Sequence, residues 1–323
     1  GIVDSYALDH LRRAGHLQDH DIPGATVVLT GVNLATTDLA THETRNTGAF
    51  SPWGTATMPG QRIEGAGPGQ AASGAIMSAN RDGSDLRVYA WGLRNPYGLA
   101  FGPDSRLYAT NNGANRVPPR PVTSDPDTLW AVEEGTWYGW PDFYAGQPVT
   151  EGSFKPPASA RHELLIANHR ALLRGLDRPP PPVVPFGLHV APCKFDFGRD
   201  PAFGFVGQAL VPEFGSLLAP PEGLMSERPQ GHRVVRVDLA LGTVSDLAVN
   251  RSRLPAAQTG NTGGLERPIE AKFGPDGSLM EVIEVPEYAA NFAWGDDDYR
   301  SLFITASTSL YRIRTAVPGH PLF

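Results

Sequence analysis

The sequence predicts an all-β fold, a six-bladed β-propeller, with five blades as the alternative count. Two observations carry this prediction: a hairpin motif that recurs around the turn Gly-Pro-Asp, and a composition rich in turn-forming residues. Gly (36) and Pro (31) together fill about a fifth of the 323 positions, while hydrophobic residues make up 41% and charged residues 19%. Such a chain can bury a full core and joins many short strands through many turns.

The recurring motif is a strand, a tight turn and a second strand. Residues 99–110 (LAFGPDSRLYAT) are repeated at 271–279 (AKFGPDGSL), and a looser copy spans 292–305 (FAWGDDDYRSLFIT). Apolar residues alternate in each strand, which is the period of a strand with one buried face. Further short strands are expected at 128–132, 232–238, 243–249 and 309–314. Meandering strands that repeat about every 40–50 residues are typical of propeller blades.

We expect one domain over residues 1–323, whose first blades, in residues 1–90, are poorly defined. Strands at 25–32 and 74–89 would supply one or two blades there. The remaining blades are centred near 100–132, 193–249, 265–285 and 290–314, and the last blade spans about 282–316. A β-sandwich whose hairpins are similar by chance is the alternative.

Two other segments stand out from the strand pattern. Residues 162–173 are the best candidate for a helix. The proline-rich segment 178–185 is expected to be an extended connector, because consecutive prolines cannot donate to a strand ladder.

Charge and composition favour a small molecule as the binding partner. The net charge is −7 with scattered Lys and Arg, so we expect neither nucleic acid nor an anionic lipid surface as a partner. The sequence offers no apolar run of the ~20 residues that a membrane-spanning helix needs. Cys193 is the single cysteine, which excludes an internal disulfide. A first residue other than Met is typical of a mature or trimmed product, so a periplasmic or extracellular location is expected. The oligomeric state stays open.

A group of motifs in the middle of the chain resembles a known family. Residues 89–104 (YAWGLRNPYGLAFGPD) are followed by 108–113 (YATNNG) and 137–141 (WYGWP). These motifs, continued at 193–197, 205–209 and 267–276, resemble the soluble PQQ-dependent sugar dehydrogenases, closest to the bacterial L-sorbosone or aldose dehydrogenase-like subgroup. The resemblance spans about residues 45–279. It implies a six-bladed propeller that oxidises an aldose or related sugar at its central channel.

The tail of the chain resembles a different family. Residues 282–318, with 291–295 (NFAWG) and 302–314, are similar to the last blade of gluconolactonase and regucalcin-type lactonases. The two resemblances join near residues 279–281. A lactonase would hold one divalent metal ion that polarises the lactone carbonyl and activates water. The residues expected as its ligands are missing, since Tyr97 and Pro268 stand at two of those positions, and 296–298 (DDD) is expected to be a solvated turn.

The dehydrogenase resemblance assigns cofactor-binding roles to Arg94 and Asn95, which would contact the quinone carbonyls of PQQ. Fixed donors suit this role because hydride arrival leaves negative charge on a quinone oxygen, and Arg94 would stabilise it during catalysis. Arg267 matches one of the family's contacts to the cofactor carboxylates. Two cations of the family pattern are missing, and Lys194 is the candidate substitute, with His189 as the alternative. The alternative for Arg94 is an ion pair with a carboxylate at a blade edge.

A calcium ion and a catalytic base complete the implied site. The family's Ca²⁺ ligands include backbone carbonyls that match Gly113 and Ala114, although an Asn-Gly turn without a metal is the alternative. The base is expected to be a His oriented by an acidic neighbour, and His189 is our candidate. Residues 9–10 (DH) and 19–21 (DHD) are alternatives without a supporting motif.

Three functions therefore follow from the sequence. The first is a PQQ- and Ca²⁺-dependent sugar dehydrogenase, and the second is a Ca²⁺-dependent lactonase. The third is a propeller that has lost its cofactor chemistry and acts as a binding scaffold.

Overall fold

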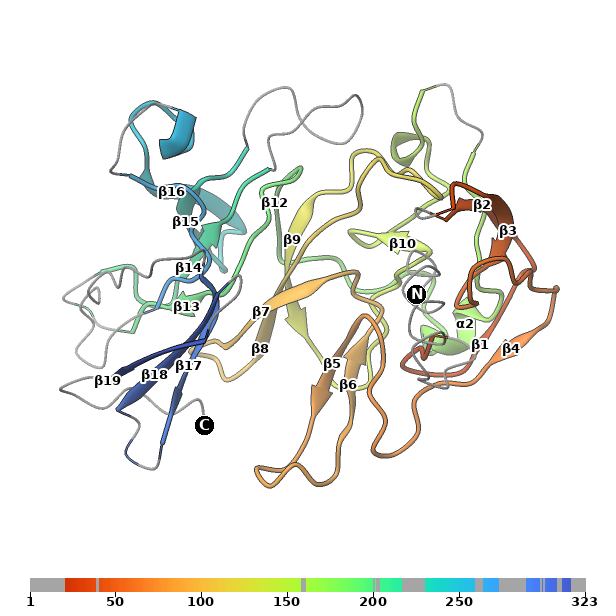
Figure 1. Ribbon diagram of the computed structural model, residues 1–323, viewed down its shortest axis with the longest axis horizontal. Helices are drawn as coiled ribbons and strands as arrows, with labels where there is room; N and C mark the ends of the chain where they lie inside the picture. The colour runs from red at the N-terminus through yellow and green to blue at the C-terminus, as the bar shows by residue number, and fades with distance from the viewer. Residues whose placement is uncertain are drawn as a thin grey trace. The chain divides into compact units, whose positions relative to one another are not determined.

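The structure is a computed structural model in which almost all regular structure is β (Figure 1). It describes residues 21–38, 41–157, 161–199, 201, 204–216, 230–258, 264–272, 289–296, 298, 300–306 and 310–314. The helical elements are α2 (His169–Leu172) and the 3-10 turns Gly152–Phe154 and Ala256–Gln258. The predicted all-β class is confirmed. No helix in the described part of the chain has the length and apolar character to span a bilayer.

The chain divides into two compact units, of which the larger contains residues 1–199 and 205–271. Its main elements are two four-stranded antiparallel sheets, with strand orders β12-β9-β8-β7 and β13-β14-β15-β16 (Figure 1). The first sheet comprises β7 (Pro96–Phe101), β8 (Leu107–Asn111), β9 (Asp127–Val132) and β12 (Val184–Gly187). The second comprises β13 (Asp196–Phe197), β14 (Ala209–Glu213), β15 (Arg233–Asp238) and β16 (Thr243–Val249). Consecutive strands pair in the second sheet and from β7 to β9 in the first, as the predicted meander requires, while β12 returns to pair with β9 after β10 and β11.

The hairpin of β7 and β8 confirms the Gly-Pro-Asp motif. Phe101 pairs with Leu107, and the backbone N–H of Gly102 donates to the carbonyl of Arg106 at 2.9 Å to close the turn. The Tyr108 hydroxyl donates to Asp104 of the same turn at 2.9 Å. The Pro-Asp sequence therefore fixes both the turn and the register of the strands that flank it.

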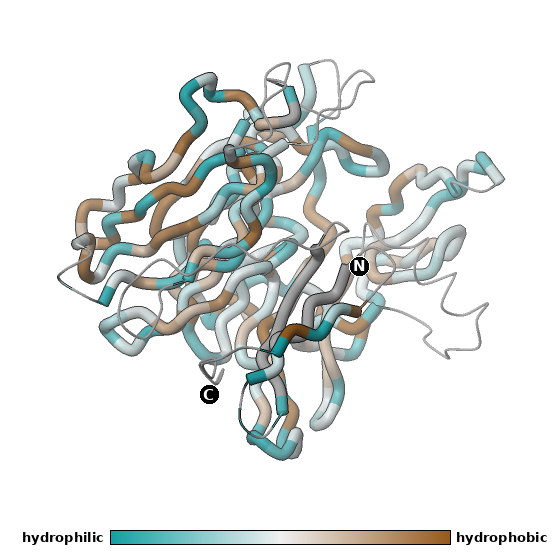
Figure 2. Tube along the Cα trace, turned by 60° about the vertical axis from the view of Figure 1, so that its left-hand side comes forward, coloured by the Kyte–Doolittle hydropathy of each residue, from teal (hydrophilic) through white to brown (hydrophobic). Residues whose placement is uncertain are grey.

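The two sheets share one hydrophobic core. Buried side chains of both sheets form it: Tyr108, Leu129, Val184, Phe195, Phe197, Ala209, Val211, Val235 and Val237. Figure 2 shows hydrophobic and hydrophilic residues alternating along much of the trace. The hydroxyl of Thr110 accepts from the N–H of Gly98 at 2.8 Å and donates to the carbonyl of Cys193 at 3.0 Å, so it joins β7 and β8 to the segment before β13.

Shorter two-stranded antiparallel sheets also belong to the larger unit. They are β1 (Val27–Val28) with β4 (Arg62–Ile63), β2 (Asn33–Thr37) with β3 (Thr44–Gly48), β5 (Ala75–Ser78) with β6 (Arg87–Trp91), and β10 (Phe143–Tyr144) with β11 (Gln147–Pro148). The predicted strand 25–32 is wrong in length, because only β1 is regular there. The predicted strand 74–89 is two strands, since a turn closed by the N–H of Asn80 and the carbonyl of Ser84 separates β5 from β6.

Two further predictions need correction. The proline-rich segment is not only a connector, because Val184 and Pro185 belong to β12, which pairs with β9. β12 is the edge strand of its sheet, where a missing proline N–H costs no ladder bond. The helix predicted at 162–173 is reduced to the four residues of α2. The segment before α2 is instead held in extended form by backbone bonds, including that from the N–H of Ala167 to the carbonyl of Val28 at 2.7 Å.

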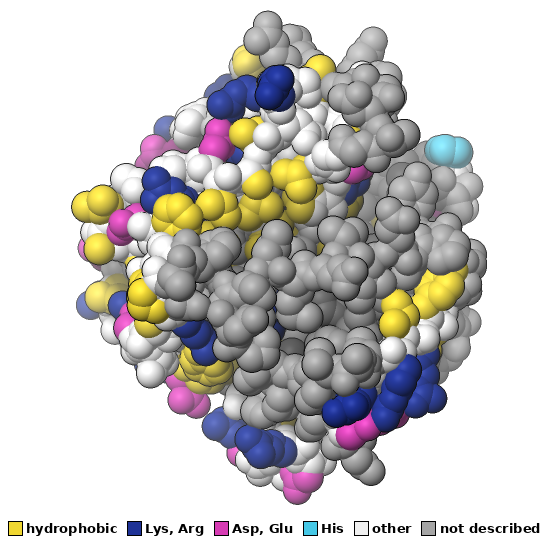
Figure 3. Space-filling model, turned by 90° about the vertical axis from the view of Figure 1, so that its left-hand side faces the viewer, with side chains coloured by type: hydrophobic (Ala, Val, Ile, Leu, Met, Phe, Trp, Pro, Cys, Tyr) yellow, Lys and Arg dark blue, Asp and Glu magenta, His cyan; other side chains and the backbone are white. Residues whose placement is uncertain are grey.

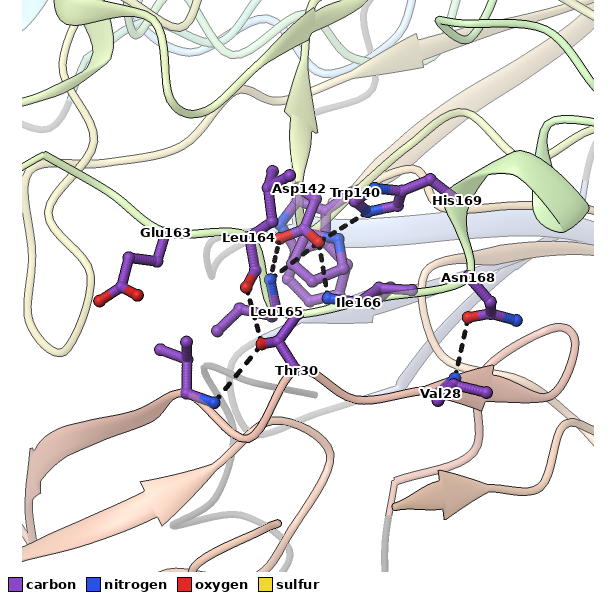
Figure 4. Close-up of polar contacts among 12 residues, drawn as sticks. Val28, Thr30, Trp140, Asp142, Glu163, Leu164, Leu165, Ile166, Asn168 and His169 are labelled. Atoms are coloured by element: carbon purple, nitrogen blue, oxygen red, sulfur yellow. Dashed lines mark hydrogen bonds and ion pairs between the residues drawn. The ribbon is translucent and has the colours of Figure 1, made fainter. Parts of the chain in front are cut away.

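Asp142 is the polar centre that keeps this segment out of a helix (Figure 4). Its fully buried carboxylate accepts from the backbone N–H groups of Leu165 at 2.9 Å and Ile166 at 2.8 Å. The carboxylate also lies 2.9 Å from Nε2 of His169 and 3.5 Å from Nη1 of buried Arg120. These bonds replace those that a longer helix would have made.

The smaller unit, residues 200–204 and 272–323, contains a three-stranded antiparallel meander. Its strands are β17 (Ala289–Gly295), β18 (Ser301–Ala306) and β19 (Leu310–Arg314), which confirms the predicted tail hairpin. Asp296 and Asp298 in its turn are exposed, as expected, and they form surface ion pairs with Arg312 and Arg314, respectively. Most of the second motif copy and the join near 279–281 lie outside the described residues. On one face, described basic and acidic side chains are interspersed (Figure 3).

Candidate functional site

The loop between β6 and β7 brings the two predicted cofactor residues against the predicted metal turn. Nη1 of Arg94 donates to the carbonyl of Gly113 at 2.8 Å and to that of Asn112 at 3.4 Å. The side-chain amide of Asn95 donates to Oδ1 of Asn112 at 2.8 Å. Arg94 therefore bonds backbone carbonyls, whereas the alternative interpretation had placed it in an ion pair.

Two buried carboxylates hold the same turn from behind. The N–H of Gly113 donates to Oδ1 of Asp127, and the N–H of Ala114 donates to Oδ2 of Asp125, both at 2.6 Å. The turn approaches the backbone so closely that a Cβ added at Gly113 would lie 2.6 Å from the carbonyl oxygen of Asp125. Gly113 is thus required for packing, and its backbone is fixed before any ligand arrives.

A small aromatic-walled pocket lies beside this turn. Its polar lining includes Arg94, Asn111 and Asp125, and its aromatic lining consists of Trp130, Tyr138, Trp140, Phe143 and Tyr144. The cavity volume is about 20 Å³, which is room for one water-sized molecule. Burial raises the pKa of Tyr144 to about 12, so this phenol stays neutral at physiological pH.

The electrostatics of the site come from burial of its carboxylates. The pKa of Asp125 is raised to about 7, chiefly by burial; the hydrogen bond from the Ala114 N–H and the charge of Arg94 lower it, and the neighbouring Asp127 raises it. The pKa of Asp127 is also raised by burial, although hydrogen bonds from Gly113 and Ala191 and the charge of His189 oppose the rise. Two acids in this position are costly to ionise, which is a frequent property of functional sites.

The raised pKa of Asp125 leads to a prediction for metal-free protein. Below pH 3.8 the carboxyl is protonated in both states, and its contribution to stability is fully present. As the pH rises from 3.8 to about 7, the unfolded chain loses this proton first, so the free energy of unfolding falls by up to about 1.4 kcal/mol per pH unit. Asp125→Asn is expected to remove this loss, measured by urea unfolding at several pH values. The exposed control Asp177→Asn should keep the wild-type slope, and an Asp125→Asn slope equal to the wild type would contradict the prediction.

His189 lies next to this cluster, in the loop after β12. Oδ2 of Asp127 accepts from the N–H of Ala191 at 2.7 Å, so one carboxylate ties the His189 loop to the metal turn. His189 is half-buried with a backbone φ of 59°, and its charge acts on Asp127. Asp127 is therefore an acid near His189, at a place where the sequence interpretation had not looked for one. The other histidine candidates, His10 and His20, lie outside the described residues.

Lys194 and Arg267 have described contacts with residues other than those of the turn at Gly113. The backbone of Lys194 bonds to that of Ile269 at 3.1 Å and bridges to Glu270. The guanidinium of Arg267 lies over the ring of Phe214, 4.7 Å from its centre, and near the carbonyl of Gly215. Arg94, Asn95, Gly113 and Ala114 thus form one contact cluster, whereas the assignment of Lys194 and Arg267 to cofactor carboxylates stays a prediction.

Sequence reasoning missed Asp125 and Asp127 altogether. The available signal was the run 124–127 (SDPD), which places two acids directly before a strand, but the partners are backbone N–H groups that no motif reveals. It also missed the pair of His169 and Asp142, whose imidazole stacks on Trp137 with ring centres 5.5 Å apart. His169 and Asp142 are absent from the pocket lining and hold the fold together there.

The donor set of the turn fits a hard cation in one respect. Two carbonyl oxygens, of Asn112 and Gly113, converge on Nη1 of Arg94, so these oxygens already bind a cationic group. Carbonyl oxygens are ligands that Ca²⁺ accepts. Among the described residues, no group of three His, Cys, Asp or Glu side chains could hold a metal by itself. Any ion here would depend on backbone oxygens and on a ligand or water.

Comparison with known proteins identifies the central motifs. Residues 62–164 match the family model described as Glucose / Sorbosone dehydrogenase. This confirms the resemblance to the sugar dehydrogenases for the segment that contains Arg94, Asn95, Gly113 and Ala114. No curated protein matches the chain. The matches named here give no support to the lactonase-like interpretation of the tail.

Several solved structures are also similar to the chain. The holo form of the pyranose dehydrogenase PQQ domain from Coprinopsis cinerea is 18% identical, with 75% of this chain and 61% of that chain covered and a TM-score of 0.37. The soluble aldose sugar dehydrogenase from Escherichia coli, in the apo-form, is 14% identical, with 70% and 45% covered and a TM-score of 0.35. The PQQ-bound aldose sugar dehydrogenase from Streptomyces coelicolor is 18% identical, with 55% and 49% covered and a TM-score of 0.27. In these alignments the chain spans 45% to 61% of the other proteins' length.

Proposed function

We propose that this chain is a sugar dehydrogenase that uses PQQ and Ca²⁺ to oxidise an aldose or a related sugar. The observation that carries the proposal is the coincidence of the family match with the contact cluster. The matched segment, residues 62–164, contains both the donors Arg94 and Asn95 and the carbonyls they approach. A binding site needs such groups to be fixed in place before the ligand arrives, and here two carboxylates fix the turn.

Each residue of the cluster has a role in this proposal. Arg94 and Asn95 would donate to the quinone oxygens, and the Arg94 guanidinium would stabilise negative charge that develops there. The carbonyl of Gly113, with those of its neighbours Asn112 and Ala114, would hold the Ca²⁺ ion. PQQ, when bound, supplies the acceptor for the hydride of the sugar. His189 would take the proton of the sugar hydroxyl on its imidazole, with Asp127 as the acid beside it.

The fit of a tricarboxylate cofactor is only partly met by the described residues. One of the missing cations would belong to the segment 210–215 (LVPEFG), which contains no lysine but has Glu213, whose buried carboxylate accepts from Nε of Arg233 at 2.7 Å. That acid cannot replace a cation. Lys194 and Arg267 are the remaining candidates for the cofactor carboxylates, and they belong to the proposal as predictions.

Reconstitution tests this function. Adding PQQ and CaCl₂ to the purified chain is expected to give a bound-quinone absorption spectrum and aldose-dependent reduction of an artificial electron acceptor, measured across a panel of aldoses. A chelator should abolish the activity, and Ca²⁺ should restore it. No quinone spectrum and no activity with any aldose would refute the proposal and favour the scaffold. Lactone hydrolysis that depends on Ca²⁺ would favour the hydrolase instead.

The finer features of the fold and location are part of the same proposal. The two four-stranded meanders of the larger unit have the antiparallel order of propeller blades, and we take six blades closing around a channel as the arrangement. A periplasmic or extracellular location is retained as part of the proposal.

A further inference from the structure

The peptide groups of the metal turn are each bonded at both ends by charged side chains. In the peptide that joins Asn112 to Gly113, the N–H donates to Asp127 at 2.6 Å and the C=O accepts from Arg94 at 3.4 Å. In the next peptide, which joins Gly113 to Ala114, the N–H donates to Asp125 at 2.6 Å and the C=O accepts from Arg94 at 2.8 Å. Hydrogen bonds in such a chain polarise one another. Both carbonyls are therefore better ligands for a cation than ordinary backbone oxygens.

The charges on the two sides of the turn are not equal. Asp125 and Asp127, at most 5% exposed, stand on the N–H side, and the single guanidinium of Arg94 stands on the carbonyl side. A divalent cation in place of Arg94 would bring more positive charge to the side opposite the two acids and would favour their ionised forms. The buried Nδ2 of Asn112 has no hydrogen-bond partner, so the turn also offers a hydrogen-bond donor that a ligand oxygen can accept from.

We propose that Arg94 is an exchangeable occupant of the carbonyl pair formed by Asn112 and Gly113. Without a divalent cation, its guanidinium holds both oxygens. A divalent cation that takes the two oxygens displaces Arg94 and frees its donors for an anionic ligand. The cation and the anion therefore bind with positive coupling, and each raises the affinity of the chain for the other. Asp125 and Asp127 are positioning residues, which act on the cation through the peptide groups. The inference deepens the proposed function, on which it rests for the identity of the ligands.

Binding of CaCl₂ alone, followed by isothermal titration calorimetry, tests the competition. Arg94→Met removes the competing charge and keeps an unbranched side chain, so it should bind Ca²⁺ at least about fivefold more tightly than the wild type. Arg174→Met is the matched control, since Arg174 also donates to a backbone carbonyl, that of Gly135 at 2.9 Å, far along the chain from the turn. The control should leave the Ca²⁺ affinity unchanged. Equal or weaker Ca²⁺ binding by Arg94→Met, or no binding by any variant, would overturn the inference.

PQQ as the anionic probe tests the coupling. Saturating PQQ is expected to raise the Ca²⁺ affinity of the wild type at least about fivefold, and this gain should vanish in Arg94→Met. Asp127→Asn should weaken Ca²⁺ binding and should leave the thermal midpoint measured without Ca²⁺ almost unchanged. A purely structural role would instead lower that midpoint. Ca²⁺ and PQQ that bind the wild type independently would refute the coupling. Failure of the proposed function is distinct, because the calcium titrations need no turnover and can succeed where sugar oxidation is absent.

Discussion

Replacing Asp142 by asparagine is expected to lower the free energy of unfolding by about 3–5 kcal/mol, the usual result of removing one partner of a buried charge pair. The carboxylate accepts the N–H groups of Leu165 and Ile166 and faces the guanidinium of Arg120, whose side chain is 3% exposed. Asparagine offers one acceptor oxygen in place of two, and its NH₂ group would face the N–H donors that the carboxylate now accepts. Arg120 would keep its charge without the compensating carboxylate.

The effect of Asp142→Asn is measured by urea unfolding, from the midpoint and the m value. Asp177→Asn is the matched control, because Asp177 is exposed and its replacement should change the free energy of unfolding by less than about 0.5 kcal/mol. A loss of under about 1 kcal/mol for Asp142→Asn would show that the network of Figure 4 does not stabilise the fold as described. Because Asp142 and His169 are absent from the pocket lining, folded Asp142→Asn should retain Ca²⁺ binding.

Arg94→Met is expected to lower kcat for sugar oxidation by about 10²–10³-fold, as the loss of one charge-stabilising donor does in other enzymes. The guanidinium is the described cation at the turn, and its Nη1 already holds the carbonyl of Gly113. Arg94→Lys should give a kcat between those of the wild type and Arg94→Met, because lysine keeps the charge but lacks the planar fork of donors. The same Arg94→Met variant is therefore expected to bind Ca²⁺ more tightly and yet to oxidise sugar more slowly.

The Arg94 prediction is checked by steady-state kinetics with reconstituted protein at saturating PQQ and Ca²⁺. Arg174→Met, the exposed arginine that bonds the carbonyl of Gly135, should keep wild-type kcat. An Arg94→Met enzyme within about threefold of the wild-type kcat would exclude Arg94 from charge stabilisation, since that role requires a loss of about 10²-fold or more. It would leave Asn95 as the remaining donor of the motif.

Local sequence pattern determined the strands of the central hairpins. The alternation of apolar residues and the Gly-Pro-Asp turn are properties of neighbouring residues, and β7, β8 and β16 follow them closely. Arg94 and Asn95, from residues 92–96 (GLRNP), lie beside the turn at Gly113, while their roles toward a cofactor stay predictions. The predictions of secondary structure were wrong where hydrogen bonds to residues distant in the sequence determine the backbone conformation. Residues 162–168 have a helical pattern, but the buried carboxylate of Asp142 takes their N–H groups, so only α2 remains.

The sequence by itself therefore determined the all-β class and the meander of hairpins, and it singled out Arg94, Asn95, Gly113 and Ala114 but missed Asp125 and Asp127. Only the tertiary structure decided which atoms meet there. Asp125 and Asp127 act through backbone N–H groups, and Arg94 acts on backbone carbonyls. Backbone groups are the same in every residue, so no sequence motif reports which of them converge. Their convergence depends on how β8, β9 and the loop before β7 pack together.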